Sequence, residues 1–359
     1  MITVEQARRV LQGVQHPEVP ENLVELRMIK DITVSEERTE ITVALPFVNA
    51  PAAEDIEESV KATVSTLDGA GEVVVKLAQM NAQERRHFMQ VVQKHQKRGA
   101  AEHLNDIHSV IAVMSGKGGV GKSLVAGLLA VALRREGKQV GILDADITGP
   151  SIPKMFFPNG ARPGSSPLGL LPADTKTGIK VMSINLLLPS EDQAVVWRGP
   201  LISGAIKQFW GDVFWDRLDT LVIDLPPGTS DATLTVMQSI PLSGVLLVTS
   251  PQDLAGMIVR KAARMAQQLK VPILGLVENM SYVQCPECGK RIEVFGPSQA
   301  DKTAQALGIP LLGRIPLDPE LAQLCDSGEV EAYSSNVFAP IAAEIAERVP
   351  EGKCKPMFK

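Results

Sequence analysis

The chain has few cysteines and no excess of positive charge. Only four cysteines occur in 359 residues, and 36 Lys and Arg residues are outnumbered by 41 Asp and Glu residues, which gives a net charge of −5. So few cysteines exclude a disulfide framework, and a close pair is better interpreted as metal-binding or redox-active. The acidic balance argues against broad binding to nucleic acids or to anionic membranes.

Long apolar runs are also absent. No run approaches the roughly eighteen residues of a membrane span, and the first residues lack the basic and apolar regions of a signal peptide. We therefore expect a cytoplasmic protein with no membrane partner. The length exceeds that of one typical domain and favours two domains.

The pattern of apolar segments divides the chain into three parts. Residues 1–80 predict a small α+β domain, with helices at 7–14 and 53–67 and strands at 26–34, 39–45 and 72–77. Residues 81–107 are rich in Arg, Lys and His and predict a basic linker. Residues 108–359 alternate strands with helices, which predicts an α/β domain with a mostly parallel, doubly wound sheet covered on both faces. Its predicted strands are 110–114, 140–143, 180–184, 221–224, 245–249 and 273–278, with an irregular excursion at 158–176.

A phosphate-binding loop follows the first of these strands. Residues 116–123 read GKGGVGKS, a match to G-x-x-x-x-G-K-[ST] between an apolar strand and a helix rich in Leu and Ala. Glycines let successive backbone N–H groups turn toward phosphate oxygens at the start of the helix. We expect Lys122 to reach the β- and γ-phosphates of ATP and Ser123 to bind Mg²⁺. The predicted ATP-binding residues of the loop are Gly116, Lys117, Gly118, Gly119, Val120, Gly121, Lys122 and Ser123.

Lys117 is an additional lysine within this loop. One chain needs only one lysine for its own phosphates. At the lip of the loop, a second cation is placed to reach the phosphates of another subunit, as an arginine finger supplied in trans does. We therefore predict that Lys117 is a catalytic residue that acts across a homodimer.

Carboxylates end two of the predicted strands. Asp224 ends the strand 221–224 and is predicted to hold Mg²⁺, although a lone Asp at a strand end is more often a helix cap. Asp144 and Asp146 follow the strand 140–143. A carboxylate that positions water favours hydrolysis of a γ-phosphate, and we assign this catalytic role to Asp146. For Asp144, satisfying backbone donors at the strand end remains an equal alternative.

The chain resembles a known family over about residues 108–330. The motifs that carry the resemblance are GKGGVGKS at 116–123, DADITGPS at 144–151, WRGP at 197–200 and DLPPGT at 224–229. They are similar to the Mrp/ApbC family of iron–sulfur cluster carrier ATPases, within the deviant-Walker class that includes the MinD and ParA proteins. This resemblance implies a homodimer that encloses two ATP molecules and delivers clusters to apo iron–sulfur proteins. It also implies that Asn279 binds adenine, although an Asn at a strand end is commonly a turn residue.

Cys285 and Cys288 form a Cys-x-x-Cys pair followed by glycine. Two thiolates complete no site, because a [4Fe–4S] cluster or a tetrahedral zinc ion needs four, which a two-fold axis would supply. Residue types alone leave zinc and iron–sulfur open, and the resemblance favours a [4Fe–4S] cluster shared between two chains. Cys325 and Cys354 lack motif spacing and are expected to be ordinary thiols, one on a helix and one in a tail.

The N-terminal part has a resemblance of its own. Residues 23–32 are similar to the small iron–sulfur assembly domain often fused to this family. Many such domains carry Cys before Pro after the second strand, whereas this chain reads Asn49-Ala50-Pro51 and has no cysteine before Cys285. This domain is therefore expected to donate no thiolate.

Two other classes compete with a slow ATPase that carries iron–sulfur clusters. A MinD/ParA-like positioning ATPase with a structural zinc at the cysteine pair would need a membrane-binding helix or a DNA-binding surface. Residues 341–349 are short and mildly acidic, and only residues 81–107 offer a basic stripe. An electron-transfer ATPase similar to the nitrogenase iron protein would use two well-separated cysteines per chain instead of a Cys-x-x-Cys pair.

Overall fold

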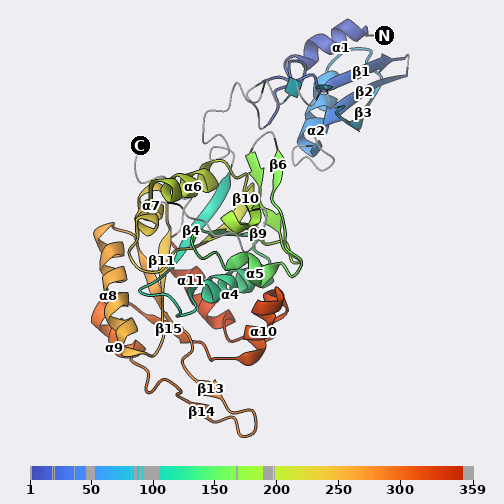
Figure 1. Ribbon diagram of the computed structural model, residues 1–359. Helices are drawn as coiled ribbons and strands as arrows, with labels where there is room; N and C mark the ends of the chain where they lie inside the picture. The colour runs from blue at the N-terminus through green and yellow to red at the C-terminus, as the bar shows by residue number, and fades with distance from the viewer. Residues whose placement is uncertain are drawn as a thin grey trace. The chain divides into compact units, whose positions relative to one another are not determined.

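The computed structural model (Figure 1) divides into two compact units, residues 1–100 with 166–168 and residues 101–165 with 169–359. Each unit is described by itself. The structure describes residues 2–17, 19, 21–35, 37–45, 53–81, 83–84, 87–88, 91, 105–166, 169–188, 197 and 199–350.

The small unit contains a three-stranded sheet and helices that contact it. Strand β2 (Arg38–Leu45) lies in the centre, antiparallel to β1 (Ile29–Val34) and parallel to β3 (Glu72–Gln79). The helices α1 (Val4–Leu11) and α2 (Ala53–Val64) supply buried residues such as Leu11 and Ile56. Period-two alternation in β2 buries Ile41 and Val43, which is the pattern of a strand with one face on the core.

The core of the small unit extends past residue 80. Met80 is buried and Phe88 is only 1% exposed, with its ring centroid 6.0 Å from that of His16. Burial lowers the pKa of His16 from 6.5 to about 4. Most of the predicted linker 81–107 lies outside the described residues, but its first part contributes to this core.

The large unit contains an eight-stranded sheet in the order β15-β12-β11-β4-β10-β5-β9-β8. All neighbouring strands are parallel except β8 and β9, which confirms the predicted α/β fold class. The strands are β4 (Asp106–Ser115), β5 (Val140–Asp144), β8 (Ala173–Asp174), β9 (Lys180–Met182), β10 (Arg217–Asp224), β11 (Gly244–Thr249), β12 (Ile273–Glu278) and β15 (Leu311–Arg314).

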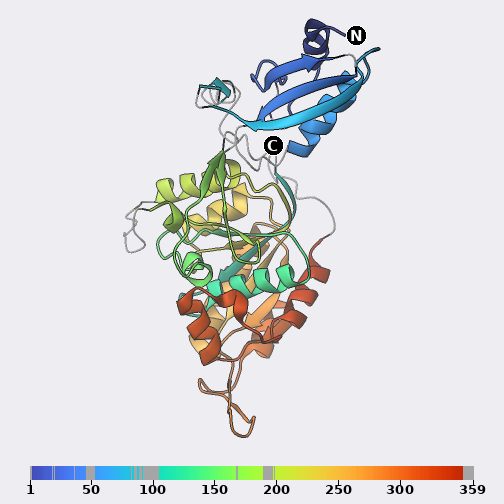
Figure 2. The ribbon, with the colours of Figure 1, turned by 90° about the vertical axis from the view of Figure 1, so that its right-hand side faces the viewer.

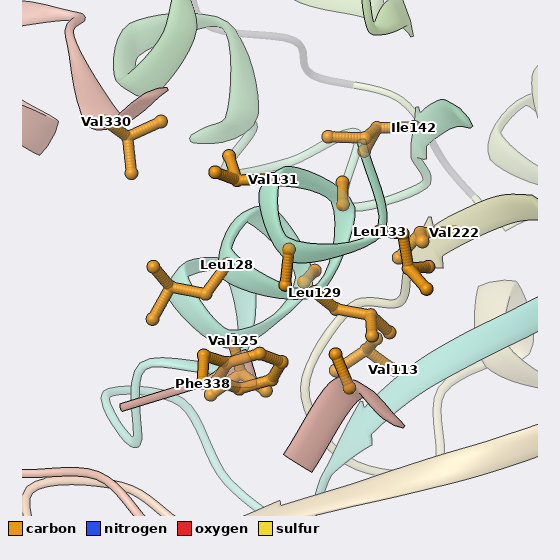
Figure 3. Close-up of a cluster of buried hydrophobic side chains, with 14 of the residues drawn as sticks. Val113, Val125, Leu128, Leu129, Val131, Leu133, Ile142, Val222, Val330 and Phe338 are labelled. Carbon is orange, nitrogen blue, oxygen red and sulfur yellow. The ribbon is translucent and has the colours of Figure 1, made fainter. Parts of the chain in front are cut away.

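Helices cover both faces of this sheet. One core cluster contains residues of α4 (Lys122–Arg135), α5 (Ile152–Phe156), α10 (Pro319–Ser327) and α11 (Ala339–Arg348). The other contains residues of α6 (Gly199–Gly211), α7 (Asp231–Ser239), α8 (Asp253–Gln268) and α9 (Ala300–Leu307). Along β4, Ile111 and Val113 join the first cluster while Ala112 and Met114 join the second, so the middle of the strand is apolar on both faces. Figure 3 shows Val125, Leu128 and Leu129 of α4 within the first cluster.

Several short elements lie outside this sheet. Residues 158–176, predicted as an irregular excursion from the sheet, contain a separate two-stranded sheet of β6 (Gly164–Ser166) and β7 (Gly169–Leu171), but also β8, which pairs with β9 at the edge of the main sheet. A hairpin of β13 (Val283–Gln284) and β14 (Arg291–Ile292) extends away from the body of the large unit (Figures 1 and 2). Two 3-10 turns occupy Ile184–Leu187 and Val330–Ala332. Across the described residues, the structure contains no helix with the length and apolar character to span a membrane.

Candidate functional site

The phosphate loop connects β4 to α4 and depends on glycine at three positions. Gly119 and Gly121 have φ of +80° and +77°, a region that favours glycine. A Cβ at Gly121 would lie 2.1 Å from Nδ2 of Asn279, and a Cβ at Gly116 would lie 2.5 Å from the backbone carbonyl carbon of Ile258. Neighbouring elements therefore restrict Gly116 and Gly121 to glycine, and backbone conformation favours glycine at Gly119, even without a bound phosphate.

Lys122, Ser123 and Asp224 contact one another. Lys122 Nζ lies 2.5 Å from Asp224 Oδ1, and the Ser123 hydroxyl donates to Asp224 Oδ2 at 2.5 Å. Lys122 is 6% exposed and Asp224 is fully buried. Burial raises the pKa of Asp224, and the charge of Lys122 opposes this effect. The predicted phosphate-binding lysine and both predicted Mg²⁺ ligands thus form one cluster, in which Lys122 and Asp224 are buried and Ser123 is half-buried.

Asp144 lies at the same edge of the sheet, and its side chain binds backbone N–H groups there. It lies opposite Asp224 in the register of β5 and β10 and is fully buried. Its carboxyl group accepts hydrogen bonds from the N–H groups of Asp146 (3.1 Å) and Ile152 (3.3 Å) and from the Ser183 hydroxyl (3.2 Å). Burial, followed by the charge of Asp224, raises the pKa of Asp144 well above its usual value. Two of these contacts are the kind expected from the alternative prediction for Asp144, in which its carboxylate satisfies backbone donors at the strand end.

Asp146 lies in the loop after β5 and is half-buried. Its Oδ1 atom accepts from the Thr148 hydroxyl at 3.2 Å and from the Gly149 N–H at 3.3 Å. Because β4, β5 and β10 are parallel neighbours, their carboxyl ends place Asp146, Asp224 and the phosphate loop at one edge of the sheet. Its role in positioning water stays a prediction.

Lys117 has a partner within its own chain. Its Nζ donates to Oε1 of Gln252 at 2.5 Å, and Gln252 is the N-cap residue of α8. Sequence reasoning missed Gln252, although its place just after the end of β11 puts it at the expected ligand-binding edge. Contact with a partner subunit would require Lys117 to exchange this hydrogen bond.

Asn279 follows β12 and supports the phosphate loop. Its buried side chain donates from Nδ2 to the backbone oxygen of Val120 at 3.0 Å, and its N–H donates to the backbone oxygen of Thr249 at 2.8 Å. The predicted contact with adenine stays a prediction. Of the WRGP motif, Trp197 is 37% exposed, Gly199 begins α6, and Arg198 lies outside the described residues.

The cysteine pair occupies the turn of the β13–β14 hairpin. The N–H of Cys285 donates to the oxygen of Lys290, and the N–H of Gly289 donates to the oxygen of Cys285, both at 2.9 Å. Hydrogen bonds from the backbone N–H groups of Cys288 and Glu287, and from the Cys288 side chain, lower the pKa of Cys285. Since the thiolate is the metal-binding form, this turn favours metal ligation.

No other residue completes this pair within the described part of the chain, where no group of three or more His, Cys, Asp or Glu could hold a metal ion. Cys325 is half-buried on α10, and burial raises its pKa to about 11, which disfavours its thiolate. Cys354 lies outside the described residues.

A phosphate loop of this geometry at the carboxyl edge of a parallel sheet defines a P-loop NTPase. A family model described as NUBPL iron-transfer P-loop NTPase matches residues 106–350, and one described as iron-sulfur cluster assembly protein matches residues 4–76. The chain belongs to this iron-transfer P-loop NTPase family, as the motifs indicated.

Relatives named iron-sulfur cluster carrier protein occur in distant organisms. The protein of Synechocystis sp. is 39% identical over 359 residues, covering 97% of this chain and 98% of the relative. The protein of Escherichia coli K12 is 39% identical, and the match covers 94% of this chain and 89% of the relative. That of Methanocaldococcus jannaschii is 48% identical and covers 70% and 88%. Among solved structures, a nucleotide-binding protein of Archaeoglobus fulgidus in complex with ADP matches with 43% identity and a TM-score of 0.59, covering 74% of this chain and 99% of that one.

Proposed function

We propose that the protein is an ATP-dependent iron–sulfur cluster carrier. A homodimer binds ATP and Mg²⁺ at its phosphate loops, hydrolyses ATP slowly, holds one [4Fe–4S] cluster between its chains and transfers it to apo iron–sulfur proteins. The observation that carries the proposal is the Cys285–Cys288 pair at the turn of the β13–β14 hairpin, with Cys288 exposed, in a chain that also has a complete phosphate loop. The names of the relatives agree with this function.

The donor set at Asp224 fits Mg²⁺. Ser123 and Asp224 present a hydroxyl and a carboxylate, the hard oxygen ligands that this ion prefers. Held by Ser123 and Asp224, the ion would neutralise negative charge that develops on the phosphates during hydrolysis. Lys122 already lies beside both residues, so it would move from Asp224 to the β- and γ-phosphates when ATP binds.

Hydrolysis in this proposal depends on two further residues. Asp146, at the same sheet edge, orients the attacking water. Lys117 leaves Gln252 and neutralises charge on the phosphates bound by the partner chain. Neither step needs a residue from the small unit.

The cluster is cargo in this scheme. Each chain supplies Cys285 and Cys288, and a [4Fe–4S] cluster needs four cysteines, so one cluster per dimer follows. Cys288 is exposed, which makes a bound cluster accessible to a recipient. We place the protein in the cytoplasm, with no nucleic-acid or membrane partner, on the grounds of its charge and apolar content.

Anaerobic purification tests the proposal. We expect a visible spectrum of a [4Fe–4S] cluster, with iron and sulfide that fit one cluster per dimer. Cys285→Ser and Cys288→Ser should lose the cluster and its delivery to an apo iron–sulfur enzyme, whereas the matched Cys325→Ser should keep both. One tightly held zinc and no iron per dimer after reconstitution would contradict the carrier function and leave a zinc-linked dimeric ATPase.

A further inference from the structure

A single buried carboxylate connects both ends of the cysteine segment, which we define as residues 282–297. Ser281 precedes this segment and its hydroxyl donates to Oε2 of Glu278 at 2.5 Å. Ser298 follows the segment and its hydroxyl donates to Oε1 of the same residue at 2.9 Å. Glu278 is 1% exposed. The two ends of the cysteine segment are therefore held at one point.

Glu278 itself has a fixed position. It ends β12 and lies opposite Thr249 of β11 and Arg314 of β15 in the parallel register. The Arg314 side chain places Nε 3.5 Å from Glu278 Oε2, donates to the Ser298 hydroxyl at 3.3 Å and also pairs with Asp301. A buried carboxylate is stable only when charge and hydrogen-bond partners compensate it, and this one has both.

The residue after Glu278 contacts the phosphate loop. Asn279 donates to the backbone oxygen of Val120, and the space beside Gly121 is filled by the same amide. A displacement of the loop at Val120 therefore acts on Asn279 directly and on Glu278 through one peptide bond. Beyond Glu278, the Ser281 N–H donates to the oxygen of Ile315 at 2.9 Å, which fixes the first end of the cysteine segment to the sheet.

We expect nucleotide binding to change the loop beside Val120. Lys122 must exchange Asp224 for phosphates, and the loop N–H groups must turn to the same ligand. Packed elements with well-defined contacts transmit such local shifts. We propose that Glu278 is a positioning residue that couples occupancy of the phosphate loop to the reactivity of Cys285 and Cys288. This inference rests on the proposed function only for the biological use of the cysteines.

Thiol alkylation in the apoprotein tests the coupling without any cluster. The rates at which iodoacetamide modifies Cys285 and Cys288 are measured by peptide mass spectrometry, with and without Mg²⁺ and the non-hydrolysable analogue AMPPNP. We expect the analogue to change these rates by about fivefold or more, as for a typical coupling between sites. Cys325, half-buried and with a raised pKa, is the internal reference and should not respond.

Glu278→Gln should bind AMPPNP with near-parental affinity and lose the nucleotide response of both cysteines. Ser281→Ala and Ser298→Ala each remove one hydrogen bond and should reduce the response, which keeps the test valid if Glu278→Gln does not fold. Asp301→Asn is the matched control, because it removes another carboxylate from Arg314 and leaves both serine contacts in place. It should respond as the parent does.

Two outcomes would overturn the coupling. One is a parent protein whose cysteines react equally fast with and without AMPPNP. The other is a set of Glu278 and serine variants that keep the parental response, as expected if dimer formation alone shields the thiols. Neither outcome depends on which metal the cysteines hold. The iron, sulfide and zinc contents of the purified protein therefore test the carrier function separately.

Discussion

Lys117 and Lys122 lie in the same loop but differ in burial and partner. Lys122 is buried against Asp224, whereas Lys117 is half-buried and bonded to Gln252. Removal of a buried lysine leaves its carboxylate without compensation, and removal of a partly exposed one does not. We therefore expect replacement of Lys122 to lower the free energy of unfolding, and replacement of Lys117 to leave it unchanged.

Lys122→Ala should reduce the free energy of unfolding by about 3–5 kcal/mol, because it breaks a buried ion pair, and should also weaken ATP binding. Chemical denaturation and nucleotide titration measure both effects. Lys117→Ala is the control and should unfold like the parent. Equal stability of the two variants would mean that the Lys122–Asp224 contact contributes little.

Asp146→Asn keeps the shape of the side chain and removes its charge. ATP and Mg²⁺ should still bind, while the rate of hydrolysis should fall by about 10²-fold or more, the usual effect of losing a positioned acid–base group. Steady-state phosphate release and equilibrium binding separate the two effects. Near-parental turnover would transfer the role to another residue of this sheet edge, with Asp144 the first candidate.

At the scale of elements, local features of the backbone explain where the observed boundaries of helices and strands differ from the predicted ones. The helix predicted at 7–14 is Val4–Leu11, because Thr3 and Gln6 form a capping box that sets its start. The strand predicted from residue 180 ends at Met182, since Ser183 caps a 3-10 turn. The strand predicted from residue 26 begins at Ile29, after Arg27 with φ of +55°.

In the candidate site, features made by consecutive residues could be predicted from the sequence, whereas contacts between residues far apart in the chain could not. The phosphate loop was predictable because its glycines, lysine and serine are consecutive residues. The contact of Lys117 with Gln252 joins residues 135 positions apart, and no local pattern reports it. The contacts of Glu278 with Ser281 and Ser298 could not be predicted from the sequence either, because a Glu at a strand end has no characteristic spacing to serine partners.

Gly121→Ala tests the contact between the phosphate loop and β12. Gly121 and Gly137 have φ of +77° and +85°, so alanine at either position should lower stability by about 1 kcal/mol. Only at Gly121 would the new Cβ displace Asn279, whereas nothing lies within 4 Å of a Cβ at Gly137. We expect Gly121→Ala to lose nucleotide affinity and Gly137→Ala to keep it. Equal affinities by calorimetry would show that the loop tolerates this displacement.

His16 predicts a pH dependence of the small unit. Its pKa is about 4 in the folded chain and 6.5 in the unfolded chain, so the unfolded chain takes up the proton first as the pH falls. Stability present above pH 6.5 should be lost progressively toward pH 4, by up to about 3 kcal/mol. Hydrogen exchange of α1 amides in the full chain, corrected for intrinsic rates, measures this loss. A His16→Leu variant should lack it, and an unchanged pH profile in this variant would assign it to other groups.

At the scale of the whole molecule, mixing variants tests whether Lys117 acts across a dimer. Lys117→Ala and Asp146→Asn homodimers should each be nearly inactive. A mixed dimer has one intact site, because the chain with Asp146 receives Lys117 from its partner. Random pairing should restore about a quarter of the parental rate, since half of the dimers are mixed and one of their two sites works. No recovery in phosphate release would mean that Lys117 acts within its own chain.

The buried Lys122–Asp224 pair also sets an order of events for the whole molecule. A nucleotide that arrived alone would attract Lys122 and leave Asp224 buried with an uncompensated charge, which costs about 3–5 kcal/mol. A divalent cation that arrived alone would meet a carboxylate already neutralised by lysine. We therefore expect nucleotide and cation to bind together as a single complex, in which the phosphates replace Asp224 as the partner of Lys122 and the cation replaces Lys122 as the partner of Asp224. The ion pair would in this way make binding of either ligand alone weaker than binding of the two together.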